Sequence, residues 1–270
     1  MEDYNKIKAI RSSELDACLI GAEYVKAMRE ANKTGTKATS FGTMAHSFIL
    51  ENNEFGKLYK PEPLALPGWE YGESKNKKAY KDWKQKTADE GKQITTTEDN
   101  MKLLKMNKAI RNHSWCKENF IPESIHSVIE ENRLFSIDNI DCKAKPDYRD
   151  PEKKIVVDLK TINPKTKKGE LVGLTEDRLR FHIQIYKYLR QQRFYQMSGL
   201  DDYNFFLLFV ENEEPFNVAV MELLKSDLLT ETANIKRAIH NYKMTDIAGT
   251  EERFYTSSEV DDEQELINLI

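Results

Sequence analysis

Three cysteines in 270 residues, Cys18, Cys116 and Cys142, are the most informative scarcity in this sequence. Three widely spaced thiols can build neither a disulfide framework nor a four-cysteine zinc or iron–sulfur site. No hydrophobic run approaches the length of a membrane span, and the first ten residues carry charges where a signal peptide needs an apolar segment. We therefore expect a soluble, cytoplasmic protein that is not exported and has no membrane partner.

The sequence also lacks a GxxxxGK[ST] phosphate-binding loop, so we expect no ATP-driven motor in this chain. It contains no internal repeat, no low-complexity segment and no convincing linker. A hydrophobic content of 39% is ordinary for a folded chain of this length. These features predict a single folded domain over residues 1–270.

An excess of basic residues is missing as well, because the formal net charge is -4. Proteins that bind nucleic acid usually carry a basic surface. The charges are unevenly spread, however: acidic residues concentrate in the last twenty positions, and residues 75–92 hold seven lysines around Tyr80 and Trp83. This asymmetry allows a basic DNA-binding track, although a lysine-rich helix is more often a solvated face.

The first half of the chain, residues 1–122, has mainly the pattern of helices. Ser12 or Ser13 can cap a helix in which apolar residues recur at helical spacing, and Gly42 begins a second one. The predicted helices cover residues 15–31, 42–52, 75–92 and 97–112.

The second half, residues 123–245, has the pattern of three strands, a long helix, two more strands and a last helix. Asp138-Asn139 and residues 150–153 are good turn sequences between the first strands. This order predicts an α/β fold with a central mixed sheet and flanking helices, followed by an acidic tail over residues 246–270. The predicted strands cover 125–137, 140–148, 154–160, 203–210 and 216–222, and the helices 175–197 and 226–242.

Charged residues end one apolar strand, where residues 155–157 run into Asp158-Leu159-Lys160. Successive side chains of a strand alternate between its faces, so Asp158 and Lys160 point the same way. If the hairpin turns about Glu152-Lys153, residues whose numbers sum to 305 face each other, which sets Asp147 opposite Asp158. The sequence thus predicts that two carboxylates and one amine converge.

Such a group suits a divalent metal, because two neighbouring carboxylates repel each other unless a cation lies between them. Oxygen ligands favour Mg²⁺ or Mn²⁺ over zinc, and Mg²⁺ is commonly held by carboxylates together with substrate phosphate oxygens. A lysine beside the metal can position or deprotonate a water or stabilise charge on the attacked phosphate. The sequence therefore predicts an enzyme that hydrolyses phosphodiester bonds. The competing interpretation is a strand-end salt bridge between Asp158 and Lys160, with Asp147 as a turn residue.

Four motifs of this sequence resemble those of the PD-(D/E)xK nucleases of the RecB-like branch. Pro146-Asp147, ten residues and then Asp158-Leu159-Lys160 resemble the nuclease core, and Gln184 with Tyr188 resembles the Gln-x-x-x-Tyr motif. Gly42 to His46 resembles the Gly-x-x-x-His helix, and Glu131 lies where such enzymes carry an acid before the Asp strand. Strand alternation favours Glu131, but its neighbour Glu130 stays an alternative. The resemblance covers residues 12 to 240 and is nearest to the RecE (exonuclease VIII) type of phage recombination exonuclease.

The resemblance implies a restriction-endonuclease-like core with a role for each matched residue. Asp147 and Asp158 would hold Mg²⁺, for which Mn²⁺ could substitute, with His46 as a further metal ligand and Lys160 acting on the attacking water. The four cysteines that bind an iron–sulfur cluster in some relatives are missing, so no cluster is expected.

Gln184 and Tyr188 are four residues apart, which places them on one helical face if the helix is continuous. The resemblance implies that they orient the lysine or the DNA backbone, and the competing interpretation is a polar pair on an amphipathic helix. His182, two residues earlier, could approach the rim of the site, although the geometry of a regular helix points it elsewhere.

The activity that the resemblance implies is exonuclease digestion of linear duplex DNA from the 5′ end, by a homo-oligomeric ring that works beside a single-strand annealing protein in phage recombination. A first alternative is a single-strand or structure-specific endonuclease with the same site. A second is an inactive DNA-binding module, and a third is a metabolic α/β protein with a coincidental Asp-x-Lys sequence.

Overall fold

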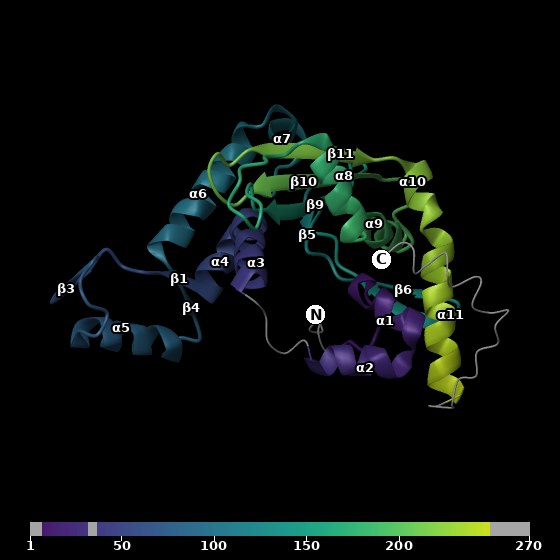
Figure 1. Cartoon of the computed structure of the whole chain (residues 1–270), viewed down its shortest axis with the longest axis horizontal. Helices are drawn as coiled ribbons and strands as arrows, with labels where there is room; N and C mark the ends of the chain where they lie inside the picture. Colours follow the sequence, from purple (N-terminus) through teal and green to yellow (C-terminus); the bar gives the residue numbers. More distant parts are fainter. Residues whose placement is uncertain (1–6, 32–36, 249–270) are drawn as a thin grey trace.

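The computed structural model describes residues 7–31 and 37–248 as an α/β molecule built on one central sheet (Figure 1). The acidic tail predicted over residues 246–270 lies, after its first three residues, outside the described residues. Within the described ranges, no helix is long and apolar enough to cross a membrane.

The central sheet has five strands in the order β11-β10-β9-β8-β5. At its centre β9 (Ile155–Ile162) and β10 (Asn204–Glu211) run parallel, while all other pairings in it are antiparallel. A parallel pair needs a crossover connection, which the helices α8 (Glu176–Ile185) and α9 (Tyr188–Gln196) supply here. The mixed sheet predicted from the sequence is confirmed. Its outer strands are β8 (Tyr148–Asp150), β5 (Val128–Ile129) and β11 (Val218–Leu223).

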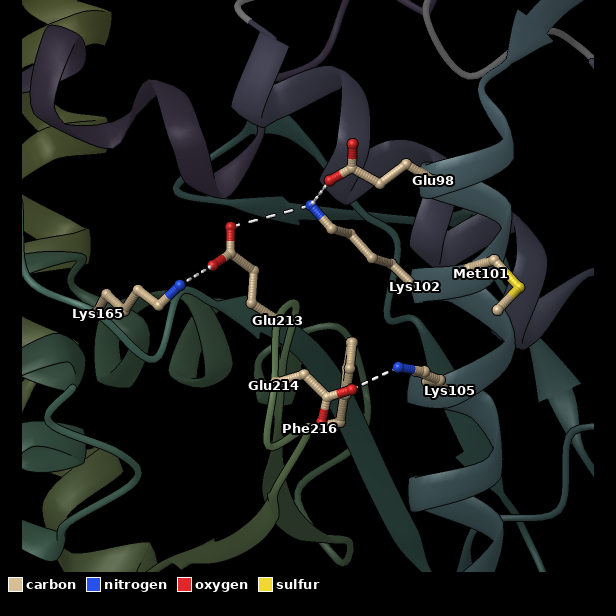
Figure 2. A pocket seen from close by; sticks show the side chains of 8 residues that line it. All are labelled: Glu98, Met101, Lys102, Lys105, Lys165, Glu213, Glu214 and Phe216. Atoms are coloured by element: carbon tan, nitrogen blue, oxygen red, sulfur yellow. Dashed lines mark hydrogen bonds and ion pairs between the residues drawn. The ribbon is translucent and has the colours of Figure 1, made fainter. Parts of the chain in front are cut away.

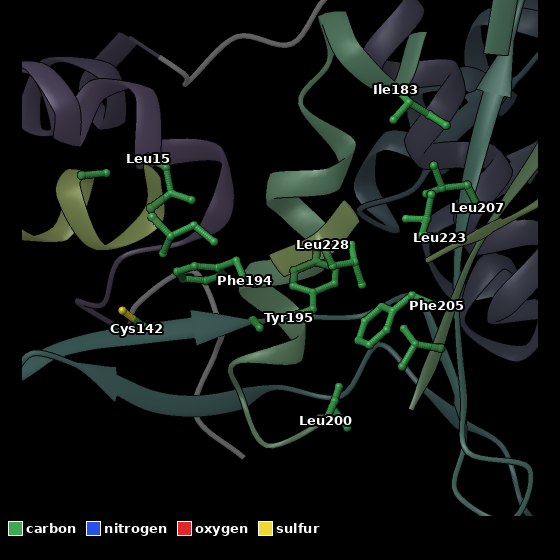
Figure 3. Close-up of a cluster of buried hydrophobic side chains, with 14 of the residues drawn as sticks. Leu15, Cys142, Ile183, Phe194, Tyr195, Leu200, Phe205, Leu207, Leu223 and Leu228 are labelled. Carbon is green, nitrogen blue, oxygen red and sulfur yellow. The ribbon is translucent and has the colours of Figure 1, made fainter. Parts of the chain in front are cut away.

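The two faces of this sheet belong to two separate hydrophobic clusters. Figure 3 draws part of the first cluster. Val156 and Ile162 of β9 belong to this cluster, whereas Leu159 belongs to the second. Because side chains alternate along a strand, Asp158 and Lys160 share the face of Val156 and Ile162. The charged pair therefore lies in the layer between the sheet and the helices α8 and α9.

Helices cover both faces of the sheet (Figure 1). Those that contribute to the first cluster are α1 (Leu15–Ile20), α2 (Ala22–Ala31), α8 (Glu176–Ile185), α9 (Tyr188–Gln196), α10 (Lys225–Thr230) and α11 (Thr232–Ala248), and α1 follows the short 3-10 helix η2 (Ser12–Glu14). Those that contribute to the second are α3 (Lys37–Leu50), α4 (Asn52–Leu58), α6 (Thr97–Asn112) and α7 (Ser114–Asn119).

Residues 59–95 form a smaller unit, here called the lysine arm, which stands apart from the sheet at the left of Figure 1. The rings of Trp69 and Tyr80 pack with their centroids 4.9 Å apart, and the Tyr80 hydroxyl donates to the buried Glu62 carboxylate at 2.6 Å. The predicted lysine-rich helix is confirmed in shorter form. The elements of the arm are β1 (Tyr59–Pro61), β2 (Ala65–Leu66), β3 (Trp69–Glu70), α5 (Lys78–Asp89) and β4 (Gln93–Thr95).

The strand predicted over residues 125–137 is wrong in its continuity, because the chain leaves β5 after Ile129 and begins β6 only at Arg133. Glu130 between them has a φ of 50°, in the left-handed region that interrupts a strand. β6 (Arg133–Ile137) and β7 (Ile140–Ala144) form their own antiparallel hairpin. Asp138 and Asn139 both have positive φ there, as a tight hairpin turn requires, so this predicted turn is confirmed.

The long helix predicted over residues 175–197 is also interrupted. Lys187 has a φ of 55° and a ψ of 38°, and this left-handed residue separates α8 from α9. A lysine carries no sequence signal for such a conformation, which is why hydrophobic periodicity alone predicted one continuous helix. The direction of every side chain after residue 187 changes as a result.

Candidate active site

The β8–β9 hairpin has the register that the sequence predicts. Tyr148 pairs with Val157 and Arg149 with Val156, so paired residue numbers sum to 305 and the next pair outward is Asp147 with Asp158. Asp147 is anchored by its own carboxylate, whose Oδ2 accepts a hydrogen bond from the backbone N–H of Leu159 at 2.8 Å. The hairpin thereby brings the two acids together just before the start of β8.

Lys160 completes this group from the same face of β9. Its ammonium forms an ion pair with Asp158 Oδ2, donates to Gln191 Oε1 at 3.2 Å and lies 4.6 Å from the centroid of the Tyr188 ring. Burial by itself lowers the pKa of Lys160, but the carboxylates of Asp158 and Asp147 outweigh it and raise that pKa above its ordinary value. Lys160 is therefore a protonated amine held in place by three contacts, with Asp158, Gln191 and Tyr188.

Asp147 is the acid whose proton affinity the site changes most. Burial and the neighbouring Asp158 carboxylate raise the pKa of Asp147 from 3.8 to about 7, against the opposing effects of His46 and Lys160. This is the response expected when two carboxylates share a pocket with too little positive charge. A divalent cation bound between them would remove that repulsion.

His46 reaches the site from α3, and its Nδ1 lies 3.4 Å from Asp147 Oδ2. The helix packs directly on β9 at Gly42, where an added Cβ would touch the Thr161 hydroxyl at 3.5 Å. Gly42 allows α3 to pack closely on β9, and this close packing places the imidazole of His46, one turn later, beside Asp147.

A possible metal-ligand group consists of His46, Glu130 and Asp147, whose ligand atoms all lie within 4.8 Å of one another. Glu130 is held there by its backbone N–H, which donates to the Asp147 carbonyl oxygen at 3.1 Å, and by an ion pair with Lys145. Asp158 is completely buried and its Oδ1 accepts no hydrogen bond. A buried carboxylate oxygen without a donor, beside three further ligands, fits a divalent cation.

The structure thus assembles only part of the metal set predicted from the sequence. His46 and Asp147 meet, Asp158 lies beside them in contact with Lys160, and Glu130 joins instead of Glu131. The alternation that favoured Glu131 does not extend back from β6, because the left-handed Glu130 interrupts the strand.

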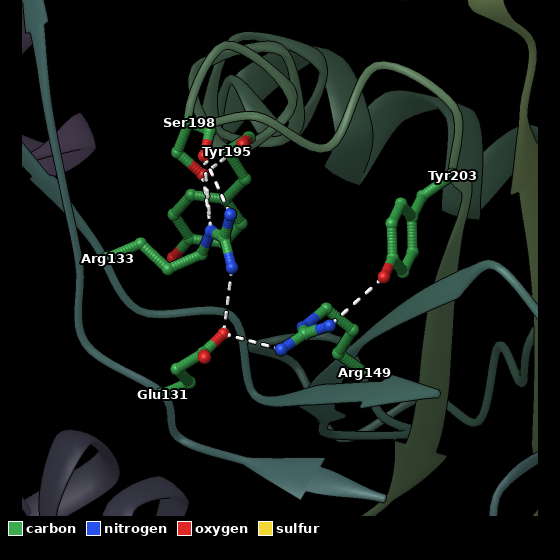
Figure 4. A network of polar contacts seen from close by, with 6 residues as sticks. All are labelled: Glu131, Arg133, Arg149, Tyr195, Ser198 and Tyr203. Atoms are coloured by element: carbon green, nitrogen blue, oxygen red, sulfur yellow. Dashed lines mark hydrogen bonds and ion pairs between the residues drawn. The ribbon is translucent and has the colours of Figure 1, made fainter. Parts of the chain in front are cut away.

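Glu131 belongs to a different network, drawn in Figure 4. Its Oε2 accepts from Arg133 at 2.9 Å and from Arg149 at 2.8 Å. Arg133 in turn donates to Ser198 Oγ at 3.0 Å, and Arg149 donates to the Tyr203 hydroxyl at 3.0 Å. This network ties β6 and β8 to the segment after α9 and engages Glu131 Oε2 with two arginines.

Gln184 and Tyr188 are not brought onto one face, because α8 ends at Ile185 and α9 begins after the left-handed Lys187. Gln184 is exposed, whereas Tyr188 lies against the Lys160 ammonium. Tyr188 is therefore placed beside the lysine, whereas a role of the exposed Gln184 at the DNA backbone stays a prediction.

Gln191 lies beside Lys160, where the glutamine of the Gln-x-x-x-Tyr motif was expected, and the sequence analysis did not identify it. Its Oε1 accepts from Lys160, and its Nε2 donates to the Tyr195 hydroxyl at 2.8 Å. Gln191 and Tyr195 repeat the Gln-x-x-x-Tyr spacing seven residues after the first copy. That repeat was the available signal, but only the break at Lys187 decides which copy faces the lysine.

A concave region lined by other residues lies between α6 and the β10–β11 connection (Figure 2). Its volume is about 310 Å³. Each of its three lysines has a carboxylate partner. The Nζ of Lys102 lies 2.9 Å from Glu98 Oε1, and the Nζ of Lys165 lies 2.9 Å from Glu213 Oε2. Lys105 forms an ion pair with Glu214. This internal pairing is typical of a structural surface.

Fold and site together define an α/β domain of the PD-(D/E)xK nuclease superfamily: a mixed sheet whose β8–β9 hairpin carries the two acids and the lysine. The chain belongs to the family described as "PDDEXK-like domain of unknown function (DUF3799)", whose sequence profile matches residues 8–254. No curated protein matches this sequence.

Solved structures that are similar to this chain include two described as exonucleases. A putative exonuclease from Eubacterium rectale shares 11% identity, with a TM-score of 0.54 over 93% of this chain and 91% of that one. A phage-related exonuclease from Haemophilus somnus 129PT shares 15% identity, with a TM-score of 0.40 over 89% of this chain and 96% of that one. The first likeness supports the nuclease-like fold.

Proposed function

We propose that this protein is a divalent-metal-dependent exodeoxyribonuclease that degrades linear duplex DNA. The observation that carries the proposal is the convergence of Asp147, Asp158 and the Lys160 ammonium in one buried cluster, where Asp158 Oδ1 accepts no hydrogen bond from the described residues. Two acids around a cation beside a fixed ammonium are the groups that phosphodiester hydrolysis needs.

In the proposed mechanism Asp147, Asp158, His46 and Glu130 hold the metal. When bound, the metal supplies charge that polarises the scissile phosphate and activates a water molecule. The Lys160 ammonium, kept protonated by the two carboxylates, orients the attacking water and stabilises the negative charge that develops on the phosphate. Gln191 and Tyr188 hold the lysine side chain in place for this role.

The finer features of the activity come from the resemblance in sequence motifs. They are Mg²⁺ as the metal with Mn²⁺ as a substitute, digestion from the 5′ end, a homo-oligomeric ring, a single-strand annealing partner and a place in phage-type recombination in the cytoplasm. The exonuclease description of the Eubacterium rectale structure supports the choice of an exonuclease over an endonuclease.

Digestion of linear duplex DNA, labelled separately at the 5′ and 3′ ends, tests the proposal. We expect nucleotides to be released from the 5′ label first with Mg²⁺, no release with EDTA, and no cutting of closed circular duplex. Asp158→Asn should abolish the release while leaving the circular dichroism spectrum unchanged. Cutting of the circular substrate would instead identify a structure-specific endonuclease, and wild-type release in EDTA would refute the metal mechanism.

A further inference from the structure

A row of aromatic rings leads along α8 and the start of α9 to the Lys160 ammonium. Ring centroids are 6.4 Å apart between Phe181 and His182, 5.4 Å between His182 and Tyr186, and 5.7 Å between Tyr186 and Tyr188. Tyr188 then lies under Lys160. We call Phe181, His182, Tyr186 and Tyr188 the aromatic row.

The left-handed Lys187 is what makes this row continuous. In an unbroken helix, residues two apart point to different sides and their rings cannot stack. Here the break between α8 and α9 turns Tyr186 onto Tyr188, with the two rings stacked at an interplanar angle of 21°. Non-glycine residues adopt this conformation at a cost in free energy, and such strain concentrates at functional sites.

The row is open to solvent at its outer end and joined to the core at its inner end. Phe181 and Tyr186 are each 59% exposed, while Leu179 and Ile183 on the opposite side of α8 are buried in the first cluster. Tyr188 is half-buried and packs against the same cluster. The helix therefore buries its aliphatic face and presents rings to the outside, the reverse of what core packing would select.

Two cations flank the row, and neither is neutralised by a carboxylate among the described residues. Arg178 donates to the carbonyl oxygens of Gly173 at 2.6 Å and Asn163 at 2.5 Å, which leaves its charge intact. Lys187 is exposed. Burial and the charge of Arg178 both lower the pKa of His182, so its ring is neutral at pH 7 and offers a π-face.

We propose that the aromatic row binds an unpaired strand of nucleic acid, with bases stacked on its rings and phosphates beside Arg178 and Lys187, and directs that strand to Lys160. Exposed rings next to unneutralised cations are the combination that binds single strands without sequence preference. The proposal rests on the proposed nuclease function, and it assigns the route by which one strand leaves the duplex to reach the pocket.

Binding and cleavage are measured separately to test it. A 12-nucleotide single-stranded oligodeoxynucleotide containing one 2-aminopurine is titrated in EDTA, where no cleavage occurs. We expect the wild-type protein to quench the probe, Tyr186→Phe to bind equally well, and Tyr186→Leu to bind about tenfold more weakly with most of the quenching gone, because the ring that stacks on a base is missing. Tyr24→Leu is the matched control, since Tyr24 is 50% exposed and lies on α2, outside the aromatic row.

Wild-type binding by Tyr186→Leu, or absence of quenching with the wild-type protein, would overturn the aromatic row as a strand-binding site. So would a lower mass of Tyr186→Leu in light scattering with unchanged binding, because the rings would then be covered by a second copy of the chain. Cleavage of labelled duplex by the wild-type protein with Mg²⁺ is recorded in parallel. Its absence would refute the proposed nuclease function, whatever the binding result.

Discussion

At the scale of single residues, the ionisation of Asp147 couples the site to the stability of the fold. In the folded protein its pKa is raised from 3.8 to about 7, so between these values the folded state binds more protons than the unfolded state. Under this condition the free energy of unfolding falls as pH rises. The site therefore carries a stability cost at neutral pH that a bound cation would relieve.

We predict that in EDTA the wild-type protein loses stability from pH 4 to pH 7 relative to Asp147→Asn, measured as the difference in free energy of unfolding by urea. Mn²⁺ should raise the melting temperature of the wild-type protein more at pH 8 than at pH 6, since binding displaces the proton. Asp147→Asn should lose this response. Parallel pH profiles of the two proteins would contradict the prediction.

Gln191 and Gln184 make a second test at this scale. Gln191 accepts a hydrogen bond from Lys160, whereas Gln184 is exposed on α8. We predict that Gln191→Ala slows DNA cleavage roughly tenfold or more, the usual effect of removing a group that orients a catalytic side chain. Gln184→Ala is the control and should keep nearly full activity. A larger loss in Gln184→Ala than in Gln191→Ala, measured as initial rates with saturating DNA, would instead assign the motif to the first glutamine.

At the scale of elements, the sequence allowed the catalytic hairpin to be predicted but not the breaks in strand and helix. The register about residues 152–153 followed from turn chemistry and from the period of two along β9, both of which are local. Glu130 and Lys187 adopt positive φ although neither is glycine or asparagine, so the local sequence does not predict the breaks at these positions. Those two breaks account for the placement of Glu130 beside Asp147 and of Gln191 beside Lys160.

The break at Lys187 leads to a prediction about stability. Glycine adopts a left-handed conformation without the steric cost that a lysine bears, so Lys187→Gly should raise the free energy of unfolding by about 1 kcal/mol. Lys187→Val should lower it by at least as much, because a β-branched side chain tolerates this region poorly. Urea denaturation measures both. A loss of stability in Lys187→Gly would mean that the lysine side chain holds the break in place.

At the scale of the whole molecule, the lysine arm is a candidate DNA contact that lies apart from the pocket. Lys78, Lys81 and Lys84 are exposed on α5, and no carboxylate pairs with them among the described residues. Each phosphate contact contributes a slope of about 0.9 to the dependence of log binding constant on log salt. The arm therefore makes a measurable contribution if it touches the duplex.

We predict that replacing these three lysines by glutamine weakens duplex binding and reduces the salt slope by roughly 1 for each phosphate that is no longer neutralised, measured by fluorescence anisotropy between 50 and 200 mM salt. Replacement of the exposed Lys26, Lys225 and Lys236, which lie outside the arm, is the control of equal charge. If both triple variants lower the salt slope equally, the lysine arm is a solvated face, and any surface lysine contributes to DNA binding to the same extent.

The central position of β9 has a consequence for the order in which the protein gains its chemistry. Leu207 and Phe209 of β10 are the registered neighbours of Asp158 and Lys160, yet they follow them by 49 residues in the chain. Until β10 has been synthesised and has paired with β9, β9 is an edge strand and Asp158 and Lys160 have no neighbouring strand on that side. A nascent or truncated polypeptide ending before residue 204 thus lacks the strand that packs beside Asp158 and Lys160, and under the proposed function it gains nuclease activity only after β10 has been synthesised and docked.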